Sequence, residues 1–283
     1  MARRIAQSRK SYNAGDGGWR AWALSSILEP DLEITPAVKR RRALAYRVGC
    51  SGWSYQHWKE AFYPHGMRQA DWFAHYASVF DTVEINNSFY RTPTDEVFRE
   101  WQRQAPPGFA YAVKVNRAIT QFYKLGINAR PLFEEFVRRA KLLGPALGPL
   151  LLQLPPSLGR DDERLASFLE LPTSESCQLA VEFRKSDWFT EDVYAILRVH
   201  RVALAVSDME GLPVPLVATA PWVYARFHGA GGGKYEGSYS DEQLRTWADR
   251  LKALAPEGYV YFNNDIGAAA PGDALRMRAF LNQ

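Results

Sequence analysis

The chain has 283 residues, of which 47% are hydrophobic and 23% charged, and its formal net charge is +4. This length suits one large α/β domain, and the composition is typical of a folded cytoplasmic protein. No stretch approaches the roughly 20 consecutive apolar residues of a transmembrane helix, so we expect no membrane anchor. The two cysteines, Cys50 and Cys177, fall inside predicted strands and form no CxxC motif. They indicate two buried thiols, and neither a disulfide scaffold nor a zinc site is predicted.

The positive charge is concentrated at the N-terminus. Residues 1–42 contain nine basic and four acidic side chains, a net charge of +5, so the remaining 241 residues carry −1. Such a segment is typical of a disordered or loosely structured extension, with a nucleic-acid tether as the alternative. Arg3 and Arg4 are not followed by the apolar segment of a secretory signal, while an organellar transit peptide stays open. We therefore predict a basic extension over 1–42 and a folded domain over 43–283.

From Tyr46 onward, short apolar or β-branched runs alternate with segments of helical periodicity, which indicates βαβ units and a parallel sheet. Eight strands are predicted, at Tyr46–Gly52, Thr82–Phe89, Phe109–Arg117, Pro149–Pro155, Cys177–Arg184, Arg201–Asp208, Trp222–Gly229 and Gly258–Asp265. Helices are predicted at Gln69–Val79, Asp95–Gln104, Pro131–Leu143, Asp162–Leu169, Glu191–Val199, Asp241–Ala255 and Asp273–Leu281. Eight strands close a single (β/α)₈ barrel of the TIM type. The alternative, an open doubly wound sheet, usually has a glycine fingerprint after the first strand, where this chain has Ser51-Gly52-Trp53-Ser54.

Local chemistry supports several of these boundaries. Ser240 and Gln243 have the spacing of a capping box, and Thr190 and Asp161 each precede an acidic pair at a helix start. The segment Met209–Pro221 contains three prolines, so we predict a long loop after the sixth strand.

Polar side chains lie in the C-terminal halves of the predicted strands. They are Glu84, Asn86, Lys114, Asn116, Gln153, Glu182, Arg184, Asp208, Arg226, His228, Asn263 and Asp265. Alternate residues of a strand share a face, so we expect the polar side chains to point inward and the apolar ones between them to face outer helices. In this fold, chemistry takes place at the mouth that the C-terminal strand ends form. The alternative is a structural ion network, for example Glu182 with Arg226 or Glu84 with Lys114.

Two further features lie near the predicted mouth. The glycine-rich segment 229–237 follows the seventh strand, where barrels often bind phosphate, although a flexible lid is an equal alternative. Aromatic residues follow the first, second, fifth and seventh strands, among them Trp53, Tyr55, Phe89, Tyr90 and Tyr235, and would either stack on a sugar or base or cap the core.

Several motifs occur in a characteristic order along the chain. They are Val48–Tyr55, Thr82–Asn86, Leu152–Pro156, Val181–Arg184, Arg226–Gly229 and Tyr261–Asp265. In these motifs the sequence resembles the YecE-like proteins, a family of TIM-type barrels classed as a domain of unknown function, over about residues 46–283. The resemblance implies the barrel and marks the mouth residues as motif positions, but it implies no assigned activity. Cys50 departs from the small hydroxyl residue expected there.

The mouth residues favour an enzyme that acts by acid–base chemistry, as a hydrolase, on a small anionic substrate containing phosphate or sugar. The candidate catalytic residues are Glu84, Glu182, Asp208 and His228. The candidate substrate-binding residues are Trp53, Asn86, Tyr90, Lys114, Gln153, Arg184, Arg226, Asn263, Asn264 and Asp265. The three cations among them would bind negative charge, a glutamate would act as general base or acid, and His228 would relay protons. A glycosidase with Glu84 and Glu182 as its two carboxylates is a variant of this hypothesis.

Two other classes of function stay open. A metal-dependent isomerase or nuclease would use Glu84, Glu182, Asp208 and His228 as ligands, although three cations compete for the same space. A non-catalytic module would bind nucleic acid or another protein through the basic extension and the aromatic mouth. We predict no bound metal and no cofactor, a small anionic molecule as the partner, no membrane association and a cytoplasmic location.

Overall fold

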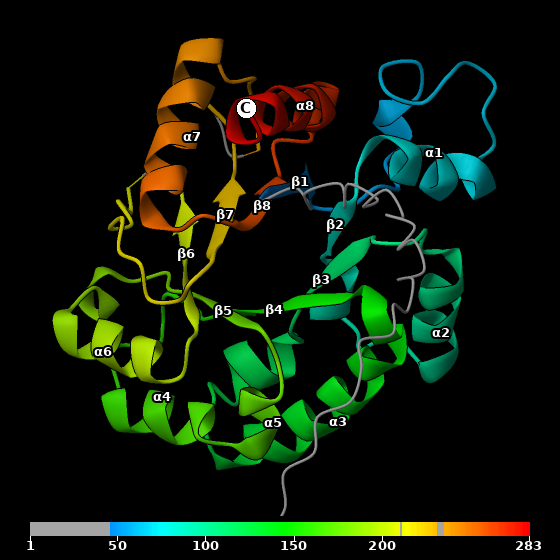
Figure 1. The fold of residues 1–283 in the computed structure, drawn as a ribbon. Helices are drawn as coiled ribbons and strands as arrows, with labels where there is room; N and C mark the ends of the chain where they lie inside the picture. The colour runs from blue at the N-terminus through cyan, green and yellow to red at the C-terminus, as the bar shows by residue number, and fades with distance from the viewer. Residues whose placement is uncertain (1–45, 210, 231–234) are drawn as a thin grey trace, which may run out of the picture. The chain divides into compact units, whose positions relative to one another are not determined.

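The computed structural model describes residues 46–209, 211–230 and 235–283, and within these ranges the eight predicted strands are all present and parallel. The strands are β1 Tyr46–Cys50, β2 Thr82–Ile85, β3 Ala110–Lys114, β4 Leu147–Gln153, β5 Leu179–Glu182, β6 Ala203–Ser207, β7 Val223–Phe227 and β8 Gly258–Phe262. They pair in the order β1-β8-β7-β6-β5-β4-β3-β2, and helices lie around the outside of this ring (Figure 1). The predicted (β/α)₈ barrel is therefore confirmed. The predicted extension over residues 1–42 lies outside the described residues.

Eight α-helices follow the strands within the described residues, and three of them begin where their capping residues predict. The eight helices are α1 Trp72–Val79, α2 Asp95–Gln104, α3 Arg130–Ala140, α4 Asp162–Leu169, α5 Pro172–Glu175, α6 Glu191–Val199, α7 Asp241–Leu254 and α8 Ala269–Leu281. The side chains of Asp161 and Thr190 accept the N3 amides of α4 and α6, and Ser240 and Gln243 form the predicted capping box of α7. The described residues of Met209–Pro221 join β6 to β7 without a helix or strand, as predicted.

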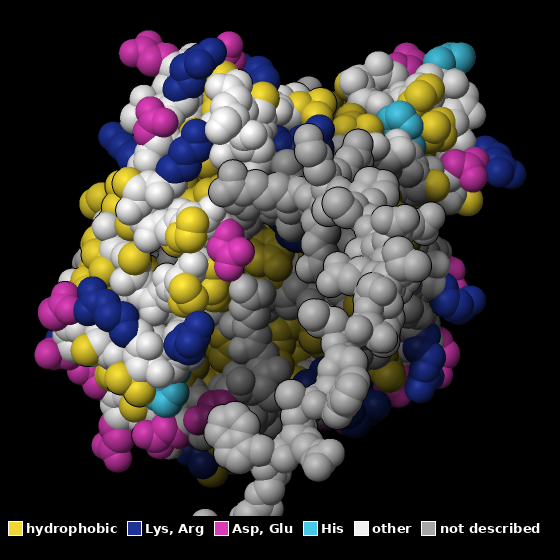
Figure 2. Space-filling view, viewed as in Figure 1, with side chains coloured by type: hydrophobic (Ala, Val, Ile, Leu, Met, Phe, Trp, Pro, Cys, Tyr) yellow, Lys and Arg dark blue, Asp and Glu magenta, His cyan; other side chains and the backbone are white. Residues whose placement is uncertain are grey.

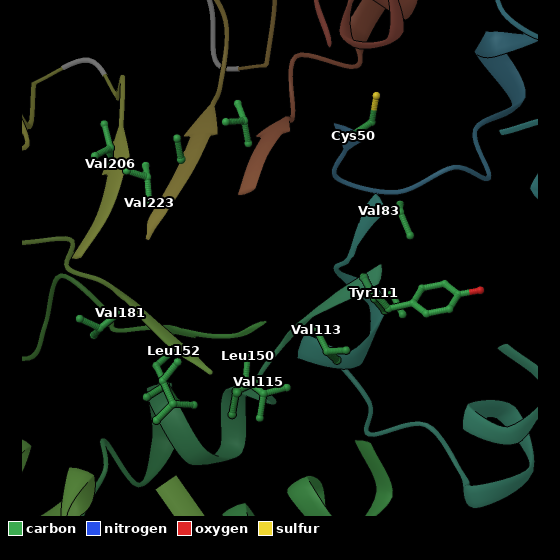
Figure 3. Close-up of a cluster of buried hydrophobic side chains, with 14 of the residues drawn as sticks. Cys50, Val83, Tyr111, Val113, Val115, Leu150, Leu152, Val181, Val206 and Val223 are labelled. Carbon is green, nitrogen blue, oxygen red and sulfur yellow. The ribbon is translucent and has the colours of Figure 1, made fainter. Parts of the chain in front are cut away.

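The two faces of the strands pack into separate apolar clusters. The outer cluster joins the strands to the helices and includes Val83, Val113, Val115, Val181, Ala225 and Phe227. Figure 3 shows several of its side chains on neighbouring strands, pointing away from the barrel interior. The inner cluster contains Ala112, Leu151, Ala180, Ala203, Ala205, Trp222, Tyr224 and Tyr261. The inward positions thus combine small and aromatic side chains, and the predicted alternation between faces is confirmed.

A tyrosine closes the seam between β1 and β2, which form no ladder hydrogen bonds within the described residues. The Tyr76 hydroxyl accepts the Cys50 backbone N–H at 2.8 Å and donates to the Thr82 carbonyl at 2.9 Å. The two strands also approach closely at Gly49, where a Cβ atom would lie 2.3 Å from the Thr82 carbonyl oxygen. One fully buried side chain therefore takes the place of a backbone hydrogen bond at the point where the ring closes.

Several strands end earlier than predicted because side chains turn the backbone. After β2, the Ser88 hydroxyl donates to the carbonyl oxygens of Ile85 and Lys114, at 3.1 and 2.6 Å, within a 3₁₀ turn. After β3, the Asn116 side chain accepts the Ala118 amide at 2.9 Å. Such local side-chain bonds compete with continuation of the strand.

The structure corrects one prediction about the cysteines. Cys50 is fully buried in β1, as predicted. Cys177 instead precedes β5, which begins at Leu179, and its side chain is only partly buried. The prediction that Cys177 is a buried strand residue is therefore wrong, because the strand starts two residues later than the apolar pattern indicates.

The described surface carries mixed charge. Figure 2 shows Lys and Arg side chains next to Asp and Glu side chains over the described part of one face. Many are paired, as Arg138 is with Asp95 and Arg160 is with Asp162. Within the described ranges, no helix has the length and apolar character needed to cross a membrane.

Candidate functional site

A cavity of about 710 Å³ opens at the C-terminal ends of the strands. Its wall includes most of the residues predicted for the site: Asn86, Tyr90, Lys114, Gln153, Arg184, Arg226, Asn263 and Asp265. These residues come from β2, β3, β4, β5, β7 and β8 or from the segments after their C-terminal ends, so the barrel brings together side chains from the whole domain. The volume lies within the range of sites for small molecules.

Arg226 forms the centre of the site and joins two buried glutamates. Its Nη2 lies 2.9 Å from Oε1 of Glu84, and its Nη1 lies 2.6 Å from Oε2 of Glu182. At most 1% of each of these three residues is exposed. Arg184 also pairs with Glu182, so two guanidiniums balance the charges of the two carboxylates.

Further hydrogen bonds hold each glutamate in place. Glu84 accepts the hydroxyls of Ser51, at 2.6 Å, and Tyr224, at 2.7 Å. Glu182 accepts the Gln153 side-chain amide at 3.1 Å and forms an ion pair with Arg184. Burial disfavours ionisation of both glutamates, but Arg226 and the other donors outweigh it, and the pKa of each carboxyl lies below its ordinary value. Both side chains therefore stay ionised and immobile at neutral pH.

Lys114 differs from the two arginines because no described carboxylate is its partner. Its side chain ends β3 at the cavity wall and is 9% exposed, and its Nζ lies 4.1 Å from the centroid of the Phe89 ring. Within the described part of the chain, no carboxylate oxygen lies within 4.0 Å of this nitrogen. Burial, followed by repulsion from Arg226, lowers the pKa of the Lys114 ammonium to about 7. The predicted pair of Glu84 with Lys114 is thus replaced by the pair of Glu84 with Arg226.

Asp208 and His228, two of the predicted catalytic residues, lie behind the cavity wall. The Asp208 carboxylate accepts the backbone N–H of His228 at 2.8 Å and the hydroxyl of Tyr239. His228 Nδ1 lies 3.3 Å from the Ser207 hydroxyl and 3.4 Å from an Asp208 oxygen. Its Nε2 is buried and has no hydrogen-bond partner among the described residues. Burial lowers the pKa of the His228 ring, so the ring is neutral at pH 7.

Trp53 and Asn264, predicted to bind substrate, do not reach the cavity. Trp53 packs edge-on against Phe73, with ring centroids 5.3 Å apart, and belongs to the outer core. The Asn264 side chain donates to the Gly237 carbonyl and to the Asp273 carboxylate, at 2.8 and 2.7 Å. Both contacts are structural, and Asn264 points opposite to its neighbour Asn263 because successive residues alternate in direction.

The cavity wall also contains residues outside the candidate set. Tyr55, Phe89 and Tyr235 belong to the aromatic residues expected near the mouth, whereas Gln121, Pro155 and Met209 were not predicted. Tyr224 shares the strand parity of Arg226, so its inward position could have been found from the sequence. Gln121 lies in a short π-helix, Ala118–Phe122, for which the sequence gives no periodic signal.

Two other predictions concern bound ions. The described residues include no group of three or more His, Cys, Asp or Glu side chains arranged to hold a metal ion. Three of the four residues that the metal hypothesis required are engaged elsewhere: Glu84 and Glu182 pair with Arg226, and Asp208 accepts the Tyr239 hydroxyl and the His228 backbone N–H. Within the glycine-rich segment, residues 231–234 lie outside the described residues.

Two curated bacterial proteins are similar to this chain in sequence. UPF0759 protein YunF of Bacillus subtilis is 26% identical over 269 residues, which span 83% of this chain and 94% of the relative. UPF0759 protein YecE of Escherichia coli K12 is 29% identical over 145 residues, 51% of this chain and 50% of the relative.

Two solved structures match most of the barrel. A DUF72 family protein of Thermotoga maritima superposes with a TM-score of 0.71 at 29% identity, covering 84% of this chain and 99% of the other. A DUF72 family protein of Enterococcus faecalis gives a TM-score of 0.68 at 20% identity, covering 84% and 96%. The family model described as "Protein of unknown function DUF72" matches residues 47–283. The chain therefore belongs to the DUF72 family, which confirms the resemblance to YecE-like proteins.

Proposed function

We propose that the protein is an enzyme that binds a small anionic substrate, containing phosphate or sugar, in the cavity and uses Lys114 for acid–base chemistry. The observation that carries this proposal is a buried lysine at the cavity wall that lies beside two arginines and has no described carboxylate partner. In this proposal the arginines bind the anion and Lys114 transfers the proton, and all three side chains line the same cavity.

The charge of the cavity wall favours an anion. Lys114, Arg184 and Arg226 line the cavity together with one carboxylate, Asp265. Nε of Arg184 is buried and has no hydrogen-bond partner among the described residues. Buried N–H groups of this kind nearly always have an acceptor, and a phosphate or carboxylate oxygen is a suitable one.

Lys114 is also better suited to proton transfer than the two glutamates. A pKa of about 7 gives comparable amounts of ammonium and amine at neutral pH, which is the condition for efficient general acid–base catalysis. Glu84 and Glu182, whose carboxyl pKa values are lowered, fix the guanidinium of Arg226 instead. We assign both a positioning role.

The alternatives find less support in the described residues. The Arg226 guanidinium contacts both Glu84 and Glu182, so these carboxylates do not flank an open space in which a glycosidic bond could lie. The metal-dependent alternative requires a cluster of metal ligands, and the described residues contain none. The nucleic-acid alternative depends on residues 1–42, which are not described.

Sulfate binding, measured by isothermal titration calorimetry at pH 8, tests the anion site. Sulfate does not titrate near this pH, whereas an anion next to Lys114 raises the pKa of the ammonium group. Binding should therefore take up a proton, visible as a dependence of the heat on the ionisation enthalpy of the buffer. Lys114→Met should abolish this uptake, and Lys141→Met, which removes an exposed lysine far from the cavity wall, should leave it unchanged. Absence of sulfate binding, or binding without proton uptake, would contradict the proposal.

Turnover tests the catalytic part. A panel of phosphate esters, phosphorylated sugars and glycosides should contain a substrate whose kcat falls at least about 100-fold in Lys114→Met, the usual contribution of an acid–base group. If sulfate binds but no member of the panel is turned over, the protein is a binding protein rather than an enzyme.

A further inference from the structure

We propose that the Lys114 amine forms a covalent imine with its substrate, an aldehyde or ketone that carries a carboxylate or phosphate group. This proposal rests on the proposed function and names the substrate class of the same site. Three features of the site support it: the amine has no described carboxylate partner, its pKa is lowered, and it lines the same cavity as the anion-binding arginines.

Lys114 is the one buried lysine among the described residues. Lys59, Lys141, Lys185 and Lys252 are exposed, and Lys124 is partly exposed. The Lys185 amine lies 2.7 Å from the Asp187 carboxylate, which favours its charged form. The Lys114 amine instead lies over the Phe89 ring at the cavity wall, where a small molecule can reach it. A nucleophilic lysine must be a free amine, and a neighbouring carboxylate would favour the charged ammonium group instead.

The protonation state of Lys114 favours attack at neutral pH. A lysine with its ordinary pKa of about 10.4 is a free amine in only about one molecule in 2,500 at pH 7. Burial and the positive charge of Arg226 lower the pKa of Lys114 to about 7, so about half of the molecules carry the nucleophilic form. The same causes activate lysines in known imine-forming sites.

The backbone at Lys114 is fixed, so the amine has a defined position. The Ser88 hydroxyl donates to the Lys114 carbonyl at 2.6 Å, and the Asn116 side-chain amide donates to the Ser88 carbonyl at 3.0 Å. Arg184 and Arg226 line the same cavity and are in turn fixed by Glu182 and Glu84. A substrate anchored by its anionic group on these arginines would present a nearby carbonyl carbon to a fixed amine.

The reaction balances without a further reagent. The nitrogen lone pair of Lys114 forms a bond to the carbonyl carbon, the C–O double bond opens, and a carbinolamine results. Loss of water then forms the C–N double bond, and both hydrogens of the amine leave with the former carbonyl oxygen. No oxidant, reductant or cofactor takes part.

Borohydride trapping tests the proposal on the full-length protein. Pyruvate supplies a ketone with a carboxylate, dihydroxyacetone phosphate supplies one with a phosphate, and acetone supplies a neutral ketone. With at least one anionic ketone, sodium borohydride should fix a single adduct, which peptide mass spectrometry should locate at Lys114. The yield should rise with pH with a midpoint near 7, and acetone should react at least about tenfold more slowly.

Matched variants separate this reaction from ordinary lysine chemistry. Lys114→Arg, which keeps the positive charge, should lose the adduct, and Lys141→Arg should keep it. Adducts spread evenly over exposed lysines, or a pH midpoint near that of an ordinary lysine, would overturn the proposal even if Lys114→Arg fails to fold. If sulfate binds with proton uptake but no ketone is trapped at Lys114, the imine is wrong and the proposed function stands. If neither occurs, both are wrong.

Discussion

Replacing Arg226 with methionine would remove the charge that holds two buried carboxylates. Arg226 contacts Glu84 at 2.9 Å and Glu182 at 2.6 Å, and both glutamates are fully buried. Breaking a buried ion pair typically costs about 3–5 kcal/mol because the remaining charge is left without compensation. Here two carboxylates lose a partner, so we expect a loss at or above this range at pH 7. Total stabilities of about 5–15 kcal/mol make this a large fraction of the free energy of unfolding.

The loss should depend on pH with a defined sign. In the wild type, the pKa values of Glu84 and Glu182 are lowered by folding, so their contribution is present above the unfolded value of about 4.3 and disappears as pH falls through the folded values. In Arg226→Met, burial without the guanidinium raises the pKa of Glu84, whereas Glu182 keeps its ion pair with Arg184, and protonation of Glu84 then relieves part of the cost. The difference in stability between the two proteins should therefore shrink as pH falls from 7 towards 5.

Urea denaturation at pH 7, 6 and 5, with linear extrapolation, measures these free energies. Arg138→Met is the matched control, because Arg138 pairs with two carboxylates, Asp95 and Glu135, on the exposed surface and should be replaced with little effect. Equal stability of Arg226→Met and wild type at pH 7, or a loss that is the same at all three values of pH, would refute the reasoning.

Three further changes test separate parts of the structure. Tyr76→Phe leaves the Cys50 N–H and the Thr82 carbonyl without the bridging hydroxyl. It should lower the free energy of unfolding, measured by chemical denaturation, by about 2–6 kcal/mol. A smaller loss would mean that the seam closes without this bridge. Ser240→Ala removes the cap of α7 and should cost about 1 kcal/mol, seen as a lower Tm by calorimetry, and an unchanged Tm would contradict the capping contact. Lys114 binds fewer protons folded than unfolded between its folded pKa of about 7 and the unfolded value of about 10.4, so wild-type stability should rise relative to Lys114→Met from pH 7 to pH 10. A flat or falling difference in urea denaturation would show that the Lys114 pKa is not lowered.

The barrel and the cavity wall could be predicted from the sequence because both follow from strand parity. Glu182 is the last residue of β5 and Arg226 the second-to-last residue of β7, and both alternate with buried apolar residues. The same alternation accounts for two candidates that miss the cavity. Asp208 comes after the inward-facing Ser207, so its carboxylate turns to Tyr239 rather than to the cavity. Asn264 comes after the cavity residue Asn263 and turns away in the same manner.

Pairing of the charges could not be predicted, because it depends on contacts between distant parts of the chain. Glu84 and Arg226 are 142 residues apart, and the sequence offers Lys114 as an equally plausible partner for this glutamate. The choice matters chemically, because Glu84 binds Arg226 and the pKa of Lys114, which Glu84 does not bind, is lowered. Trp53 shows the same limit for aromatic residues: its motif is recognisable, but only the packing against Phe73 reveals that the ring belongs to the core.

The tyrosine-bridged seam also bears on when the site comes into existence during folding. Glu84 lies on β2, and Ser51, whose hydroxyl donates to it, directly follows β1. The hydrogen bond between them therefore crosses the same seam that Tyr76 closes. A chain in which β2 to β8 have assembled but β1 has not docked would lack this contact. The electrostatic arrangement around Lys114 is therefore a property of the completed ring, and a partly assembled barrel would not hold Glu84 and Arg226 in the same way.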